Sequence, residues 1–358
     1  MKKLGRQVLF LGTDETNMRN GEGSFIRLNS GRIVFGFTEF LGNDWDDDAT
    51  AQISAVYSDD EGETWSERRV LFAKPDNSLN IMSLSFLRMN NGDVGAFYIV
   101  KNTDGTDKIV LRRSADEGES WGDAVNCFDC LEVQDYYVIN NDRVIRLKSG
   151  RIIFAVARHT VLSGAEDFTP GVICFFYSDD DGKTWQKTDT ELPCPHKNNP
   201  DGYEEPGLYE LPDGRLWCYI RTSLGFQYEC FSSDEGITWT QPEPNMFFSS
   251  ACSPMLVKDC GELTLAVFNP VPEHLLRKES EPWGRTPYVL AVSTDRAASF
   301  KKENVFYLED DLNNGYCYPA IIECEGGLLV AYYHSNGTGV CLNCTKIVKI
   351  KQEEITGK

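Results

Sequence analysis

Apolar residues along the chain come in short runs that alternate with polar turns. The runs are five or six residues long and rich in β-branched and aromatic side chains, as in Ile53–Tyr57, Ile109–Arg113, Val172–Tyr177 and Tyr288–Val292. The sequence contains no stretch of useful length with the 3.6-residue period of an amphipathic helix, so the pattern is typical of β-strands. It predicts an all-β protein.

Two motifs recur in strict alternation. The first reads Ser-x-Asp-x-Gly-x-Ser/Thr-Trp, with four copies and a degenerate fifth at Ser58–Trp65, Ser114–Trp121, Ser178–Trp185, Ser232–Trp239 and Ser293–Phe300. The second is a glycine turn followed by an apolar strand, with its glycine at Gly31, Gly92, Gly150, Gly214, Gly261 and Gly326. Glycine supplies positive φ, Asp and Ser bond local amides, and the terminal aromatic ring inserts between sheets. These motifs therefore build the scaffold.

The spacing of the glycine turns predicts the architecture. Successive turns are 61, 58, 64, 47 and 65 residues apart, which is enough for the four antiparallel strands of a propeller blade. We expect six blades in one domain over residues 1–358, because no linker-like run divides the repeats. The sixth unit lacks a motif copy after its glycine, so Val8–Leu11 is expected to supply its fourth strand and to close the ring.

Composition narrows the classes of function. The 358 residues include 35 Lys and Arg against 55 Asp and Glu, a formal net charge of −20, which opposes nucleic-acid binding. No apolar run approaches the ~18 residues of a membrane span, and Val8–Leu11 is too short for a secretory signal. We therefore expect a cytoplasmic protein with no nucleic-acid and no membrane partner.

The 12 cysteines are too sparse for a disulfide scaffold. Two Cys-x-x-Cys pairs, Cys127/Cys130 and Cys341/Cys344, are about 210 residues apart and lack the compact spacing of known zinc modules. We expect no metal and no cofactor.

The copies of the eight-residue motif resemble the Asp-boxes, or BNR repeats, of the sialidase (neuraminidase) superfamily, and the resemblance covers nearly the whole chain. It implies a six-bladed sialidase-like β-propeller and a small carbohydrate as the partner. Asp-boxes also occur in proteins that do not cleave sialosides, so the function has to be argued from the site.

In a propeller, the innermost strand of each blade lines the central channel. Counting back nine residues from the turn glycines gives Glu22, Ser83, Asn141, Glu205, Cys252 and Cys317. Polar residues such as Glu22 and Asn141 are costly to bury unless they bind a ligand or pair with each other. Two interpretations stay open: a ligand site at one rim, with Glu22 and Asn141 among its binding residues, or mutual pairing that plugs the channel.

The resemblance also implies roles for single residues. Glu204-Glu205-Pro206 is similar to the sialidase segment with the glutamate partner of the nucleophile, which makes Glu205 the base. Tyr318 resembles the nucleophilic tyrosine of the last blade, and Tyr316 is the alternative for that role. Asp47, eleven residues before the first motif copy, lies where the family keeps its acid/base aspartate.

Asp46 and Asp48 flank Asp47, so either of them is an alternative for the acid/base residue. Arg221 and Arg285 look like two arginines of the family's carboxylate clamp.

The chain departs from the family pattern at the third clamp arginine. Sialidases carry an Arg-Ile-Pro signature before the first turn, and the corresponding stretch here is Gly21–Phe25. By its position in the repeat, Arg143 is expected to point into the channel from another side, with Arg158 and His159 on the next strand. This substitution allows a substrate other than a sialoside.

The resemblance therefore implies an exo-acting, retaining glycoside hydrolase of the sialidase type, for a terminal anionic sugar. A carboxylate nucleophile would be repelled by the carboxylate on the anomeric carbon, whereas a phenol approaches neutral and is activated by a base. Guanidinium groups are the right partners for the sugar carboxylate. Two alternatives remain: a glycosidase or lyase for a non-sialic sugar such as a uronic acid, and a propeller that binds carbohydrate without catalysis.

Overall fold

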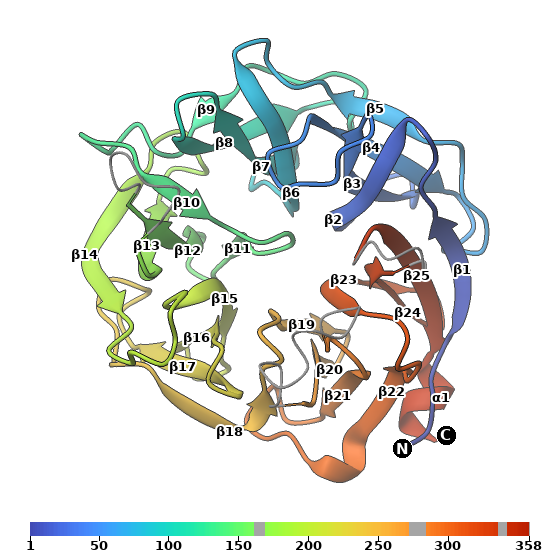
Figure 1. The fold of residues 1–358 in the computed structure, drawn as a ribbon. Coiled ribbons are helices and arrows are strands. Elements are labelled where there is room, and N and C mark those ends of the chain that lie inside the picture. Colours follow the sequence, from blue (N-terminus) through green and yellow to red (C-terminus); the bar gives the residue numbers. More distant parts are fainter. Residues whose placement is uncertain (161–168, 272–283, 336–341, 358) are drawn as a thin grey trace.

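The β-branched and aromatic runs form antiparallel strands in six sheets. The structure is a computed structural model that describes residues 1–160, 169–271, 284–335 and 342–357. The sheets surround a common axis as the blades of a propeller (Figure 1). The predicted all-β, six-bladed fold is confirmed.

The first three blades are formed by residues 17–193, and in each the strands follow one another from the axis outwards. The first contains β2 (Asn17–Arg27), β3 (Ile33–Leu41), β4 (Ala51–Ser58) and β5 (Arg69–Phe72). The second contains β6 (Ser78–Arg88), β7 (Val94–Asn102), β8 (Asp107–Ser114) and β9 (Val125–Asn126). The third contains β10 (Tyr136–Val138) and β11 (Ile145–Arg146), which both pair with β12 (Ile152–His159), and then β13 (Val172–Ser178) and β14 (Gln186–Pro193).

The remaining blades complete the ring. The fourth contains β15 (Glu204–Glu210), β16 (Leu216–Arg221), β17 (Phe226–Ser232) and β18 (Glu243–Ser249). The fifth contains β19 (Leu256–Cys260), β20 (Leu263–Phe268), β21 (Tyr288–Ser293) and β22 (Val305–Glu309), with the 3-10 turn η2 (Lys302–Asn304) before β22. The sixth contains β23 (Tyr316–Cys324), β24 (Gly327–His334), β25 (Cys344–Lys351) and β1 (Arg6–Leu11), and the short helix α1 (Gln352–Thr356) follows β25.

The N-terminal strand closes the ring as predicted. β1 runs antiparallel to β25, with Gln7 opposite Val348, and the two chain ends lie side by side in Figure 1. β25 therefore has a strand on both sides and is not left as an open sheet edge.

The eight-residue motifs are held by the same hydrogen bonds in each copy. In the first, Ser58 Oγ donates to Asp60 Oδ1 (2.8 Å), and Asp60 Oδ1 accepts from the backbone N–H of Thr64 (2.8 Å). The final aromatic ring packs against a neighbouring strand, as Trp239 does when it stacks on Phe175 with ring centroids 4.2 Å apart. The motifs thus act as scaffold, as their composition predicted.

Each blade has one residue with a positive φ on the inner side, at Glu22, Ser83, Glu205 and Tyr318 within the innermost strand, at Asp142 between β10 and β11, and at Cys252 just before β19. At Glu22, Ser83, Glu205 and Tyr318 the strand register also shifts, which marks a β-bulge. A bulge bends the strand and redirects a side chain. Four of these positions match the predicted channel residues, and two fall one residue later, at Asp142 and Tyr318.

Residues 140–143 form an axial plug, which reaches the centre of the ring from the segment between β10 and β11 (Figure 1). Asn141 Nδ2 donates to the carbonyl oxygens of Gly23 (2.6 Å) and Pro319 (3.2 Å). Asp142 accepts from Ser24 Oγ (2.8 Å) and Lys258 Nζ (2.7 Å). In this part of the channel the polar residues pair with each other.

Candidate active site

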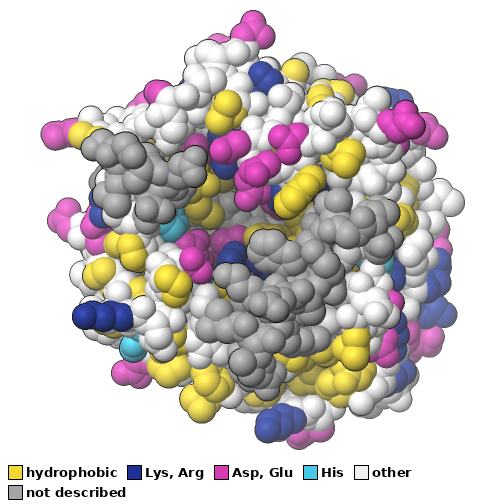
Figure 2. Space-filling model, viewed as in Figure 1, with side chains coloured by type: hydrophobic (Ala, Val, Ile, Leu, Met, Phe, Trp, Pro, Cys, Tyr) yellow, Lys and Arg dark blue, Asp and Glu magenta, His cyan; other side chains and the backbone are white. Residues whose placement is uncertain are grey.

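A pocket of about 610 Å³ opens at one end of the ring, where the innermost strands of blades 1, 4 and 6 begin. Figure 2 shows a hollow over the ring centre in which acidic, basic and histidine side chains gather. Its charged, histidine and tyrosine side chains are Arg19, Asp47, Tyr136, His159, Asp201, Glu204, Glu205, Arg221, Arg285, Tyr318 and Tyr333. The pocket therefore collects all three predicted catalytic residues and two of the three predicted clamp arginines.

Tyr318 and Glu205 meet across the pocket floor. Tyr318 Oη donates to Glu205 Oε1 (2.7 Å), and Arg221 Nη1 donates to Glu205 Oε2 (2.6 Å). Both Tyr318 and Glu205 have left-handed backbones, with φ of 55° and 40°. Non-glycine residues adopt this conformation at a cost, so the two bulges hold the pair in place against local strain.

The surroundings of Tyr318 keep its phenol protonated. Burial raises the pKa of Tyr318 well above its ordinary value, and the Glu205 carboxylate raises it further, while Arg285 and Arg221 act in the opposite direction. A buried phenol of this kind becomes a nucleophile only if a base accepts its proton, and Glu205 is at hydrogen-bond distance to do so.

Arg221 and Arg285 lie beside this pair and are supported by sulfur and carbonyl groups. Arg221 Nη2 donates to Cys252 Sγ (3.2 Å), while Arg285 donates to Cys252 O (2.9 Å) and Cys317 Sγ (3.4 Å). The Arg285 guanidinium carbon is 5.7 Å from the centre of the Tyr318 ring. Both guanidinium groups line the pocket, where an anion can reach them.

Arg19, on β2, is a third arginine in the pocket, and the sequence pattern did not predict it. Its Nε donates to Tyr333 Oη (2.7 Å), its Nη2 to Glu22 Oε1 (2.5 Å) and its Nη1 to Asp47 Oδ1 (2.5 Å). The first blade therefore brings an arginine into the pocket, although the sequence pattern predicted none there. Its position could have been recognised from the sequence, because Arg19 lies three residues before Glu22, the first predicted channel residue.

Asp47 lies on the loop between β3 and β4 and is 61% exposed. Its backbone is fixed, because Asn80 Nδ2 donates to the carbonyl oxygen of Asp47 (2.7 Å), and Lys101 Nζ pairs with the adjacent Asp48 (3.0 Å). Partial loss of solvent inside the pocket would by itself raise the pKa of the Asp47 carboxyl, but Arg19, Lys101 and Arg285 hold it below its ordinary value. Of the three neighbouring aspartates, only Asp47 lines the pocket.

His159 and Glu204 form a pair in the pocket wall. His159 Nε2 is 3.1 Å from Glu204 Oε1, and Nδ1 is 2.8 Å from the carbonyl oxygen of Thr169. Burial raises the pKa of Glu204, and although burial alone would lower the pKa of His159, its bond to Glu204 raises it. Both pKa values are therefore higher in the folded protein than for the free side chains in water, so the pair binds protons more tightly.

Four predicted substrate-binding residues lie outside the pocket lining, in addition to Asn141 in the axial plug. Arg143 is 2% exposed, and its Nη1 donates to Tyr219 Oη (3.1 Å). Arg158 pairs with Glu191 (2.8 Å) and Asp135 (3.5 Å).

The other two are Tyr316 and Glu22. Tyr316 is fully buried against Tyr288, Tyr332 and His334, so of the two alternatives for the nucleophile Tyr318 is the one that lines the pocket. Glu22 lies directly behind Arg19 and also accepts from Ser83 Oγ (2.8 Å). Arg143 misses the predicted place because the inner strand of its blade is interrupted between β10 and β11.

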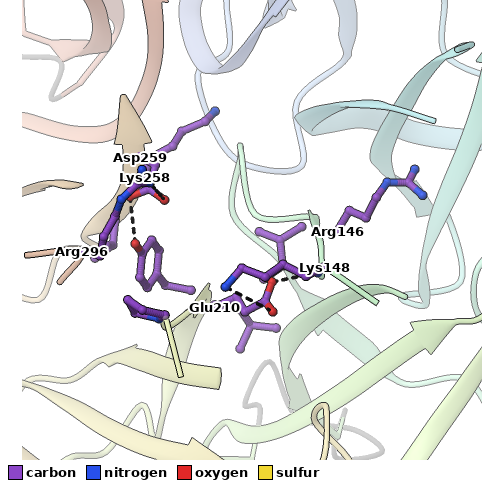
Figure 3. A pocket seen from close by; sticks show the side chains of 11 residues that line it. Arg146, Lys148, Glu210, Lys258, Asp259 and Arg296 are labelled. Carbon is purple, nitrogen blue, oxygen red and sulfur yellow. Dashed lines mark hydrogen bonds and ion pairs between the residues drawn. The ribbon is translucent and has the colours of Figure 1, made fainter. Parts of the chain in front are cut away.

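A second cavity, of about 470 Å³, lies at the opposite ends of β11, β15 and β19 (Figure 3). Each of its basic side chains has an acidic neighbour: Arg146 with Asp181, Lys148 with Glu210, Lys258 with Asp142 and Arg296 with Asp259. The basic charge there is balanced by ion pairs, and Tyr209 Oη donates to Asp259 Oδ1 (2.8 Å).

No group of three metal-ligating side chains occurs within the described ranges of the chain. Cys127 is buried and Cys130 exposed, while Cys341 of the other predicted pair lies outside the described residues. No described helix is long and apolar enough to cross a bilayer.

The sequence matches the family profile of the BNR repeat-like domain over residues 46–331. The chain belongs to this family. It is also 30% identical over 146 residues to the anhydrosialidase of Macrobdella decora, an alignment that covers 39% of this chain and 17% of that protein. The resemblance to sialidases deduced from the motifs is thus confirmed.

Solved structures of sialidases share the fold of this BNR-repeat protein. The NanB sialidase of Streptococcus pneumoniae has a TM-score of 0.74 and 16% identity, over 98% of this chain and 71% of that one. The intramolecular trans-sialidase of Ruminococcus gnavus, in complex with oseltamivir carboxylate, has a TM-score of 0.73 and 14% identity, over 98% of each chain. At such identities the likeness supports the fold, and the activity has to come from the site.

Proposed function

We propose that this protein is a retaining exo-glycosidase that removes a terminal sugar acid, with Tyr318 as nucleophile. The observation that carries the proposal is the placement of the Tyr318–Glu205 pair and of Arg19, Arg221 and Arg285 in one pocket. A phenol joined to a base, in a pocket that three guanidinium groups also line, fits a substrate with a carboxylate beside the reacting carbon.

In the first step, Tyr318 Oη bonds to the anomeric carbon while its proton passes to Glu205. The bond from this carbon to the leaving oxygen breaks, and Asp47 gives that oxygen a proton. In the second step, Asp47 takes a proton from water, the water oxygen bonds to the anomeric carbon, and Tyr318 leaves and recovers its proton from Glu205. Two displacements at one carbon retain its configuration.

The exo mode of action is supported by the axial plug. Residues 140–143 bond to blades 1 and 6, and we propose that they close the pocket at its inner end. A blind pocket accepts the end of a saccharide and excludes its interior.

The test is hydrolysis of matched aryl glycosides of N-acetylneuraminic acid, glucuronic acid and a neutral hexose. We expect turnover of an anionic substrate, and Tyr318→Phe should lower kcat by at least about 10³-fold while sugar-acid binding stays within a few fold. Binding without turnover by the wild type would favour a carbohydrate-binding propeller. Preference for the neutral glycoside would contradict the arginine clamp, and preference for the glucuronide would select the uronic-acid alternative.

A second candidate is intramolecular transfer, favoured by the likeness to an anhydrosialidase and to an intramolecular trans-sialidase. In that reaction a hydroxyl of the bound sugar, rather than water, attacks the carbon attached to Tyr318. The released sugar then has one water fewer than the free acid. Mass spectrometry of the product separates the two reactions by about 18 Da, the mass of the water that intramolecular attack leaves out.

A further inference from the structure

Four of the five N–H groups of Arg19 have partners in the described part of the chain before any ligand binds. Its three nitrogens donate to Tyr333, Glu22, Asp47 and the carbonyl oxygen of Trp45. Its guanidinium carbon also lies 4.4 Å from the centre of the Phe40 ring. A sugar carboxylate can therefore form a bidentate pair with Arg19, through two N–H groups, only if one of these partners leaves.

The partners differ in their freedom to move. The side chain of Glu22 is 4% exposed and is held by Ser83 and Tyr333, and Tyr333 is itself 1% exposed. Asp47 is 61% exposed, and within the described part of the chain its carboxylate bonds to Arg19 alone. Its backbone stays anchored through Asn80 (2.7 Å), so rotation of the side chain is enough to release Arg19.

We propose that the substrate carboxylate takes the place of the Asp47 carboxylate on Arg19, and that the released Asp47 then becomes the proton donor to the leaving oxygen. This inference rests on the proposed function. Asp47 occupies the anion site in the free protein, and the charged part of the substrate makes it available for catalysis. A substrate without a carboxylate would leave Asp47 on Arg19.

Electrostatics supports the exchange. Glu22 and Asp47 already contact one guanidinium at 2.5 Å each, and a third carboxylate on Arg19 would add repulsion without a further cation. In the exchange one carboxylate replaces another, so the charge around Arg19 does not change.

The protonation of Asp47 follows from the loss of its ion pair. In the free protein Arg19, Lys101 and Arg285 together hold the pKa of Asp47 below its ordinary value against the effect of partial loss of solvent. The other groups that interact with Asp47 through space are Glu22, Tyr136 on β10 and Tyr333 on β24. Without Arg19, and with a second carboxylate nearby, Asp47 takes one proton from solvent and can pass it to the leaving oxygen.

The experiment is calorimetric titration with N-acetylneuraminic acid at about pH 5, above the ordinary Asp pKa of about 3.9, in two buffers of different ionisation enthalpy. The exchange predicts the uptake of up to one proton per sugar acid bound. Asp47→Asn should abolish this uptake and tighten binding by about tenfold, because the competing carboxylate is gone. The uncharged methyl ester of the same sugar should bind without proton uptake.

Asp46→Asn is the matched control, since it removes the same charge from the same loop at an exposed residue that does not contact Arg19. It should keep the proton uptake and change affinity by less than about twofold. Binding of the sugar acid without proton uptake, or equal effects of the two variants, would overturn the exchange and leave the proposed function intact. Failure of the wild type to bind any sugar acid would overturn both.

Discussion

Glu204 and Glu205 are adjacent in the sequence, but their carboxylates have different hydrogen-bond partners and therefore different possible roles. Glu205 accepts from Tyr318 (2.7 Å) and Arg221 (2.6 Å), whereas Glu204 bonds to His159 (3.1 Å). Both carboxylates line the pocket. Only Glu205 contacts the proposed nucleophile, so the chemistry at Tyr318 depends on this residue.

Glu205→Gln should therefore lower kcat by about 10²- to 10⁴-fold, the usual contribution of a general base. The amide still offers an oxygen to Tyr318, so KM should change little. The measurement is steady-state kinetics on the anionic aryl glycoside, with Glu204→Gln as the matched control. The control should lose less than about tenfold in kcat, and a similar loss in both variants would contradict the assignment of the base.

The His159–Glu204 pair predicts how stability depends on pH. Both pKa values are raised in the folded protein, so the fold binds more protons than the unfolded chain from about pH 4.5 to above pH 6.5. This stabilisation is complete below the unfolded pKa values and is lost as the pH rises through the folded ones. Replacing both residues with Gln should flatten the pH dependence of the free energy of unfolding.

Urea unfolding of the wild type and of the His159→Gln/Glu204→Gln variant at pH 5 and pH 8.5 provides the measurement. The difference in unfolding free energy between the two proteins should be larger at pH 5, by on the order of 1 kcal/mol. A larger difference at pH 8.5 would mean that the pair is not held by this shared proton.

At the scale of elements, the fifth copy of the eight-residue motif has an alanine at a position where the turn requires a left-handed backbone. Ala297 occupies the position that glycine holds in the other copies, with φ of 61°. A left-handed residue with a Cβ costs about 1–2 kcal/mol. The hydrogen bonds of the motif persist all the same, since Asp295 Oδ1 accepts from the N–H of Ser299 (2.9 Å).

Ala297→Gly should stabilise the protein by about 0.5 kcal/mol, because relief of the left-handed conformation exceeds the added freedom of the unfolded chain. Ala298→Gly is the matched control: its φ is not positive, so it gains nothing from glycine and should be neutral or destabilising. Thermal unfolding of both variants decides the matter, and an equal or lower Tm for Ala297→Gly would mean that the left-handed alanine carries no such cost.

The strand repeat could be predicted from sequence because each motif fixes the geometry of its own turn. Two arginines could not be placed in this way: Arg19 was not predicted in the pocket, and Arg143 was predicted there but lies outside its lining. Arg19 reaches the pocket through two register shifts in β2, and no hydrophobic pattern reveals such shifts. Arg143 follows the repeat in sequence, yet it turns into the blade packing because β10 and β11 are separate segments. Glu205 was found by counting back from its turn glycine and by its resemblance to a sialidase segment, whereas Tyr318, one residue beyond the counted position Cys317, was found by the resemblance alone.

At the scale of the whole molecule, the net negative charge repels an anion that the arginines of the pocket would attract at short range. The chain carries a net charge of −20, and yet three arginines line the pocket proposed to bind an anion. Long-range repulsion acts over the Debye length, which falls from about 30 Å at 0.01 M salt to about 8 Å at 0.15 M. Contacts inside the pocket act over a few ångströms and are screened much less.

Added salt should therefore favour the encounter with an anionic substrate. Between 10 and 150 mM NaCl, we expect kcat/KM for the anionic aryl glycoside to rise by about two- to fivefold while kcat stays constant, because screening removes the repulsion and spares the clamp. Potassium acetate at the same ionic strength tests whether an anion competes at the arginines, since competition raises KM in a salt-specific way. A steep fall of kcat/KM in both salts would mean that the field of the arginines extends beyond the pocket and outweighs the acidic surface.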